Sequence, residues 1–199
     1  MLNKVMGSLY DNRLALYRIS DEKIHDVKIK NFVIMALDHA PEKFWTSPSS
    51  GSGKYHPPED QGNGGLVRHI IKCAYISEEL ASFFSITDRQ RDVVLAGSIL
   101  HDIQKNGIPW GQKTHNEHGK IAYEWLDRFP LGMPEKDEIR NCVRYHMYRW
   151  CMPEDELPRA VQPIISEKIV QLSDFFSSRQ CASFLPGIMI NEEDIKSYF

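Results

Sequence analysis

The chain has 199 residues, of which 42% are hydrophobic and 26% are charged, and its formal net charge is −3. This length allows one compact domain with a sizeable core, and the composition excludes a disordered chain. Because the net charge is weakly negative, the protein surface as a whole does not produce a field that attracts a long polyanion. We therefore expect no extended nucleic acid as a partner.

The spacing of the cysteines and the hydropathy of the chain indicate where in the cell the protein works. The four cysteines form no C-x-x-C pair, and the first residues do not resemble a signal peptide. We therefore expect no disulfide framework and no cysteine-based zinc site, and we expect a reducing, cytoplasmic environment. No window of about 18 uninterrupted apolar residues occurs, which argues against a membrane span. The oligomeric state stays open.

The first 65 residues divide into two parts. Apolar periodicity predicts two supporting helices within residues 1–40, over roughly 8–18 and 26–39. Residues 41–65 hold five of the twelve glycines and four of the eleven prolines, and they fit no regular element. A long connection of this kind is either a functional loop or a flexible spacer. We favour the functional loop because it carries Phe44, Trp45, Lys54, Tyr55 and His56, although Phe44 and Trp45 can equally serve to anchor it to the core.

After Gly65 the pattern is helical throughout. Apolar spacing predicts five further helices, over roughly residues 66–84, 87–105, 114–129, 134–150 and 164–180. Thr87 or Asp88 would cap the second of these, and Thr114 with Glu117 would cap the third. No strand alternation is present, so we expect an all-α helical bundle in a single domain. Its parts would be supporting helices 1–40, a Gly/Pro-rich loop 41–65, a core 66–180 and a C-terminal extension 181–199.

Each of the five later helices carries a group that can bind a metal. In chain order these groups are His69, His101 with Asp102, His115 or His118, His146, and Asp174. Helical bundles build metal sites from side chains that project inward from separate helices. Imidazoles and carboxylates suit divalent Fe, Mn, Co, Ni, Zn or Mg, among which the sequence does not choose. Six groups exceed the need of one ion, and a central carboxylate can bridge two ions about 3.5–4 Å apart. We therefore expect two divalent ions, bridged by Asp102.

Taken singly, these residues have simpler explanations. Asp102 lies in the apolar run "ILHDIQK", where an unpaired carboxylate would cost several kcal/mol. Lys105 follows three residues later and can pair with it without any metal. A single histidine such as His69 or His146 is more often a hydrogen-bonded core residue. The ordered set as a whole favours the metal interpretation.

The ordered set resembles the HD-domain superfamily of metal-dependent phosphohydrolases, over roughly residues 62–180. The resemblance rests on the segments "GGLVRH", "LAGSILHDIQK", "HGKIA", "VRYHM" and "LSDFFSSR". Gln104 departs from it, since the family often has glycine at that position. His118 is preferred to His115 because the residues after it match the family segment. The resemblance implies four core metal ligands and two ligands of a second position, namely His69, His101, Asp102 and Asp174, then His118 and His146.

The resemblance implies hydrolysis of a phosphoester or phosphoanhydride by metal-activated water, with a nucleotide or related small molecule as substrate. Asp102 and Lys105 would be catalytic, while Lys54, His115 and Arg179 would contact the substrate. One alternative is a 3′–5′ nuclease acting on single-stranded ends, against which the acidic balance counts. Another is a regulatory module that binds metal or nucleotide without turnover, against which the complete ligand set counts. The sequence does not identify the substrate.

Overall fold

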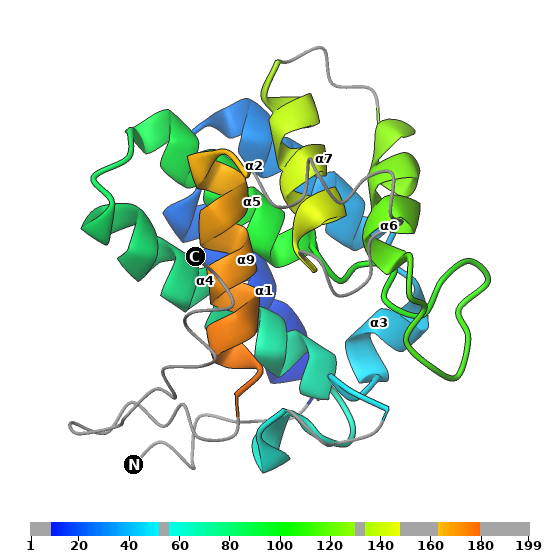
Figure 1. Cartoon of the computed structure of the whole chain (residues 1–199). Coiled ribbons are helices and arrows are strands. Elements are labelled where there is room, and N and C mark those ends of the chain that lie inside the picture. Colours follow the sequence, from blue (N-terminus) through cyan, green and yellow to red (C-terminus); the bar gives the residue numbers. More distant parts are fainter. Residues whose placement is uncertain (1–8, 52–55, 130–133, 148–162, 180–199) are drawn as a thin grey trace, which may run out of the picture.

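The computed structural model describes residues 9–51, 56–129, 134–147 and 163–179. These residues form α-helices joined by turns and contain no strand, which confirms the expected all-α class (Figure 1). The helices are α1 (Leu9–Lys23), α2 (Val27–Asp38), α3 (Glu42–Thr46), α4 (Gly65–Phe83), α5 (Asp88–Leu100), α6 (His118–Asp127), α7 (Glu135–Tyr145) and α9 (Ile165–Ser177), with a 3₁₀ helix η2 at Pro58–Asp60.

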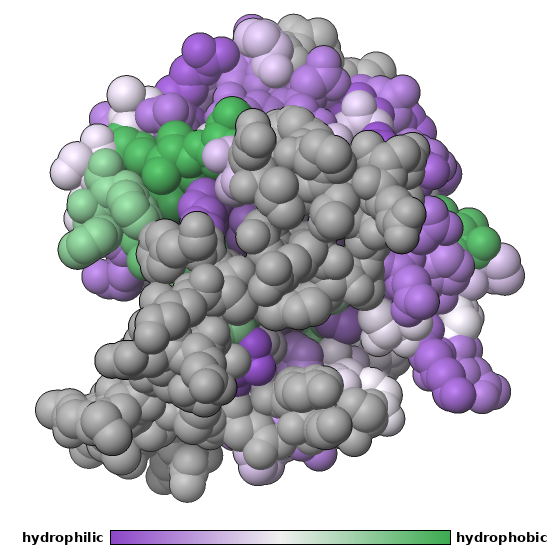
Figure 2. All heavy atoms as spheres, in the orientation of Figure 1, coloured by the Kyte–Doolittle hydropathy of each residue, from purple (hydrophilic) through white to green (hydrophobic). Residues whose placement is uncertain are grey.

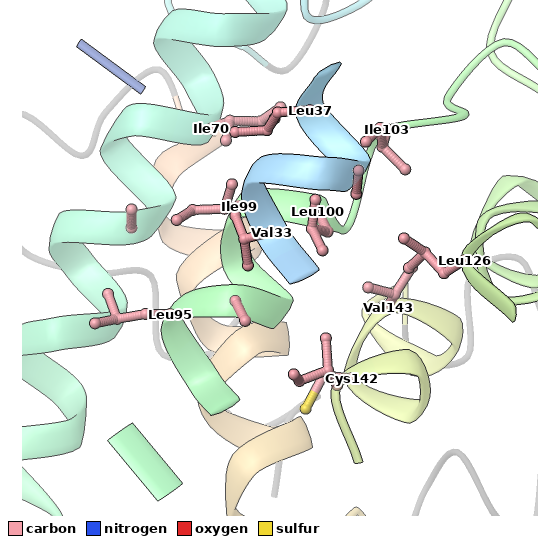
Figure 3. Packing of buried hydrophobic residues seen from close by; sticks show 14 of the residues in the cluster. Val33, Leu37, Ile70, Leu95, Ile99, Leu100, Ile103, Leu126, Cys142 and Val143 are labelled. Atoms are coloured by element: carbon pink, nitrogen blue, oxygen red, sulfur yellow. The ribbon is translucent and has the colours of Figure 1, made fainter. Parts of the chain in front are cut away.

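Helix α5 is the centre of the bundle. It packs against α1, α2, α4, α7 and α9, and every residue from Asp92 to Leu100 is buried. Leu95, Ile99 and Leu100 are fully buried, and Figure 3 shows them among Val33 of α2 and Val143 of α7. Burying one such aliphatic side chain contributes about 1.5–3 kcal/mol relative to leaving it exposed. The hydrophobic effect therefore fixes the helix whose C-terminal end leads into "HD".

Polar contacts fix where α5 and α2 begin. Thr87 accepts a hydrogen bond from the backbone N of Gln90 (3.3 Å), and the Gln90 side chain accepts one from the Thr87 backbone N (3.1 Å). This capping box makes Thr87, and not Asp88, the N-cap. Asp92 of α5 is buried and accepts from the backbone N of Asp26, the N-cap of α2 (2.6 Å). The start of α2 is thus bound to the side of α5.

Several predicted helix boundaries were wrong. Helix α1 runs to Lys23 and not to residue 18, and α7 ends at Tyr145 and not at residue 150. Two further differences lie beside the expected metal site. Helix α5 ends at Leu100, so the His–Asp pair lies in the turn that follows it and not inside a helix. Helix α6 begins at His118 and not at Thr114. The backbone N of His115 instead donates to the carbonyl of Lys105 (2.9 Å), which holds the segment before α6 against the turn after α5. A contact between distant segments has overridden the local capping signal.

The described residues of the 41–65 segment contain regular elements that the sequence did not indicate. These elements are α3 and η2, and Phe44 and Trp45 are buried in an edge-to-face pair, so these two residues do anchor the segment to the core. A Cβ on Gly65 would lie 1.7 Å from the carbonyl oxygen of Asp60, so only glycine allows η2 to lie this close to the start of α4. Lys54 lies outside the described residues.

The described surface is mostly hydrophilic on the face shown in Figure 2, with its largest hydrophobic area at the left. Phe83 and Phe84, at the C-terminal end of α4, are exposed. Within the part of the chain that the structure describes, no helix combines the length and the apolar character needed to cross a membrane.

Candidate metal centre

The bundle brings all six expected ligand residues to one site. Most of them lie at helix ends. His118 is the first residue of α6, His146 follows the last residue of α7, and His101 and Asp102 follow α5. The other two come from within α4 and near the end of α9. Five of the six are almost fully buried and the sixth, Asp174, is partly exposed; the set is His69, His101, Asp102, His118, His146 and Asp174.

Three of the histidines are oriented in the same way, by a hydrogen bond between Nδ1 and a backbone carbonyl three residues earlier. Nδ1 of His101 lies 2.7 Å from the carbonyl of Ser98, and Nδ1 of His146 lies 2.6 Å from that of Val143. Nδ1 of His118 lies 2.7 Å from the carbonyl of the residue three positions before it. A carbonyl can only accept, so Nδ1 of each ring carries the proton and the neutral ring has its lone pair on Nε2. Such contacts fix the tautomer and direction of metal-binding histidines.

His69 is oriented by a side chain from another helix. The hydroxyl of Ser177 donates to the carbonyl of Asp174 (2.9 Å), and its oxygen lies 3.1 Å from Nδ1 of His69. Because the hydroxyl proton is already engaged, Ser177 accepts from Nδ1–H and leaves the Nε2 lone pair free. No sequence pattern pointed to Ser177, because its contact joins α9 to α4.

The Nε2 atoms converge without protons between them. Those of His69 and His101 are 3.3 Å apart, and those of His118 and His146 are 3.0 Å apart. Oδ1 of Asp174 lies 3.1 Å from Nε2 of His69. Lone pairs directed at one another at these distances repel, and a cation between them turns the repulsion into attraction. The donor set therefore fits a divalent ion.

Asp102 lies between the two histidine pairs. Its Oδ2 contacts Lys105 and lies 3.4 Å from Nε2 of His101, whereas its Oδ1 lies 3.1 Å from Nε2 of His118 and 3.7 Å from that of His146. Although burial opposes it, the Lys105 ammonium holds the pKa of Asp102 well below its usual range. The lysine pair exists, but it satisfies only one oxygen. The buried Oδ1 has no hydrogen-bond partner among the described residues and is positioned for a cation.

The pKa shifts of two histidines and both aspartates also suit metal binding, whereas that of His101 does not. Burial lowers the pKa of His69 and His146, which favours the neutral imidazole that a metal requires. For His101, burial is outweighed by the Asp102 carboxylate, and the pKa is raised. Partial burial opposes ionisation of Asp174 too, yet its close contact with His69 and the neighbouring imidazoles lower its pKa. Both carboxylates are ionised at neutral pH.

A cavity of about 410 Å³ opens beside the cluster, a volume typical of small-molecule sites. Lys105, Asp174 and Arg179 line it, and the guanidinium of Arg179 lies 3.9 Å above the ring of Phe175. His115 is exposed and is not among the lining residues. His56, which the sequence indicated only as part of the 41–65 loop, does line the cavity; the other lining residues are Ser49, Ser50, Thr114, His118, Met147, Phe175 and Ser178.

The comparisons with known proteins agree with this geometry. The model of the HD domain family matches residues 66–178, which is more than half of the chain and spans every residue of the cluster. No curated protein and no solved structure matches. The buried histidines and aspartates thus lie within the matched segment, in the order α4, α5, α6, α7, α9. The chain belongs to the HD domain family, and so to the HD superfamily of metal-dependent phosphohydrolases.

Proposed function

We propose that the protein hydrolyses a phosphoester or phosphoanhydride of a small molecule, with a nucleotide as the class of substrate. The observation that carries this proposal is the position of Asp102, with one oxygen toward each pair of histidine nitrogens. A carboxylate shared in this way is what a two-ion hydrolytic site requires.

Six residues would hold the ions. When bound, such ions lower the pKa of water and polarise phosphoryl oxygens. The carboxylate of Asp102 would be shared, and the carbonyl contacts to Nδ1 would keep each imidazole turned toward its ion. The first position would use His69, His101, Asp102 and Asp174, and the second His118, His146 and Asp102.

The cavity wall supplies the contacts for a phosphate. Lys105 lines the cavity with its ammonium held by Asp102, and it would neutralise charge on the transferred group. Arg179 would clamp phosphate oxygens, since the ring of Phe175 beneath it fixes the plane of the guanidinium. The limited volume and the net charge of −3 favour a small substrate over a long polyanion.

The test is phosphate release from a panel of nucleotides, cyclic nucleotides, dinucleoside polyphosphates and short oligonucleotides, with Mn²⁺, Co²⁺ or Mg²⁺ added to metal-free protein. Asp102→Asn keeps the volume but removes the charge, so we expect it to lose both bound metal and activity. Asp92→Asn is the matched control: Asp92 is also a buried aspartate, but it lies on α5 and contacts the start of α2. We expect it to keep metal and turnover.

The same panel separates the alternatives. Stepwise shortening of oligonucleotides, with no release from mononucleotides, would favour the nuclease. Tight metal binding without turnover of any substrate would favour a regulatory module. If the protein binds no divalent ion under any condition, the proposal is wrong.

A further inference from the structure

A buried thiol lies beside the metal-facing nitrogen of the first ligand histidine. Cys73 follows His69 by one turn of α4 and is fully buried. Its Sγ lies 3.6 Å from Nε2 of His69 and 3.0 Å from the hydroxyl of Ser177. The thiol therefore touches both the ligand and the residue that orients it.

We propose that Cys73 adds a sulfur donor to the position formed by His69, His101 and Asp174, which makes this position selective for borderline-soft ions such as Zn²⁺ and Co²⁺. The inference rests on the metal centre proposed above and specifies which ions that centre prefers. Thiolates favour such ions, whereas Mg²⁺ and Mn²⁺ favour oxygen ligands.

The separations among the donors support a four-donor site. A tetrahedral zinc site has edges of about 3.3 Å between two nitrogens and about 3.6 Å between nitrogen and sulfur, given Zn–N near 2.05 Å and Zn–S near 2.3 Å. The observed His69–His101 and His69–Cys73 separations are 3.3 and 3.6 Å. All four donor atoms, including that of Asp174, lie within 4.8 Å of one another, so an ion would need to draw the more distant ones inward.

The surroundings leave a role for a sulfur donor. Oδ2 of Asp102, the oxygen on this side of the cluster, is shared with the Lys105 ammonium, so it would be the weakest donor of this position and Cys73 would supply a stronger one beside it. Coordination by Cys73 would break its S–H bond, release the proton to water and form a sulfur–metal bond, with no change in oxidation state. To donate to the thiolate 3.0 Å away, the Ser177 hydroxyl would have to turn from the Asp174 carbonyl that it contacts in the metal-free protein.

Cobalt titration of the metal-free protein tests the inference. We expect a sulfur-to-cobalt charge-transfer band in the near ultraviolet, which Cys73→Ser abolishes while the visible d–d bands of bound cobalt remain. A variant with Cys142, Cys151 and Cys181 all replaced by serine keeps Cys73 as its only thiol, and it should keep the band. In competition titrations Cys73→Ser should weaken Zn²⁺ binding more than Mn²⁺ binding.

The outcomes distinguish this inference from the proposed function. Cobalt bound without the charge-transfer band, in the wild type and in the variant that keeps only Cys73, would overturn the sulfur ligand and leave the metal centre intact. No cobalt binding at all would overturn both. Because the band is read in proteins that retain Cys73, the inference stays falsifiable even if Cys73→Ser does not fold, which circular dichroism would show.

Discussion

Single hydrogen bonds decide which nitrogen of each histidine faces the site. In His101 and His146 the proton on Nδ1 is held by a carbonyl three residues earlier, at a helix end where carbonyls lack intrahelical partners. The chain thus satisfies an orphan carbonyl and orients a ligand with one contact. His69 lies inside a helix, where carbonyls are already engaged, and it uses Ser177 instead.

Ser177→Ala should weaken metal binding with little loss of stability. The change removes the acceptor for Nδ1–H of His69, so the ring is free to turn or to change tautomer, and we expect affinity to fall by roughly 10- to 100-fold. Competition with a chelating dye measures the affinity. Ser173→Ala is the control, because Ser173 is a buried serine on the same helix whose hydroxyl donates to the Ile169 carbonyl. Equal affinities for the two variants would contradict the orienting role.

The elements position the ligands through close contacts between helices. A Cβ on Gly119 would lie 2.7 Å from the carbonyl oxygen of Arg144 and 3.0 Å from that of Val143. Only glycine therefore lets the start of α6 lie directly against the end of α7. This contact brings His118 and His146 to within 3.0 Å, which gives a physical reason for the glycine in the "HGKIA" segment.

Gly119→Ala should damage the fold and the site together. Pushing α6 away from α7 should cost about 1–3 kcal/mol of stability, as overpacking does, and should separate His118 from His146. Urea denaturation measures the first effect and metal titration the second. Gly51→Ala is the control, since its Cβ would meet nothing within 4 Å. A variant that loses stability but binds metal as before would show that this crossing does not position the ligands.

Glu78 joins three helices through ion pairs away from the site. Its carboxylate contacts Lys23 of α1 and Arg91 of α5. Burial opposes ionisation, but these two cations outweigh it and lower the pKa of Glu78. A carboxyl with a lowered pKa stabilises the fold above its unfolded pKa, near 4.3, and this contribution is lost as the pH falls through the folded pKa.

Glu78→Gln should therefore cost about 1 kcal/mol at pH 7, and the difference from wild type should shrink as the pH falls below about 4. Thermal unfolding across pH 3–7 measures it. Glu79→Gln, a change at an exposed neighbour, should have no effect at any pH. A deficit that stays constant with pH would mean that packing of the side chain, and not its charge, is responsible.

At the scale of the whole molecule, the proposed metal centre connects the helices that surround the core. The ligands come from α4, α9 and the ends of α5, α6 and α7, so any global unfolding must disperse them. Metal that binds only the folded state stabilises it by mass action. In the metal-free fold, Oδ1 of Asp102 has no hydrogen-bond partner among the described residues, and the imidazole nitrogens face one another. Both arrangements are electrostatically unfavourable.

Added Zn²⁺ or Co²⁺ should therefore raise the melting temperature. At a free concentration 100 times the Kd the gain is about 2.7 kcal/mol, or about 5–10 °C for a chain of this size. Scanning calorimetry with and without a chelator measures it. Asp102→Asn should show a much smaller rise, and an equal rise in that variant would place the stabilising ion elsewhere on the protein.

The sequence was sufficient for whatever depends on short-range patterns. Apolar spacing predicted the α-helices on both sides of residues 41–65, and the Thr87 capping motif acts over three residues, so each could be recognised locally. The six candidate ligands were found because their order along the chain is distinctive, and the match over residues 66–178 confirms the family. Their roles as ligands stay a prediction.

Contacts between distant segments could not be predicted in this way. Cys73 and Ser177 touch although 104 residues separate them, and nothing near either residue indicates this. Helix α6 starts at His118, and not at Thr114 as predicted, because the backbone N of His115 donates to the Lys105 carbonyl. Only the folded chain brings about this contact. Local periodicity and capping act within a helical turn or two, so the sequence by itself determined which helices form and which residues could bind metal. Helix packing, which depends on all the buried side chains together, decided which donors meet and which side chains orient them.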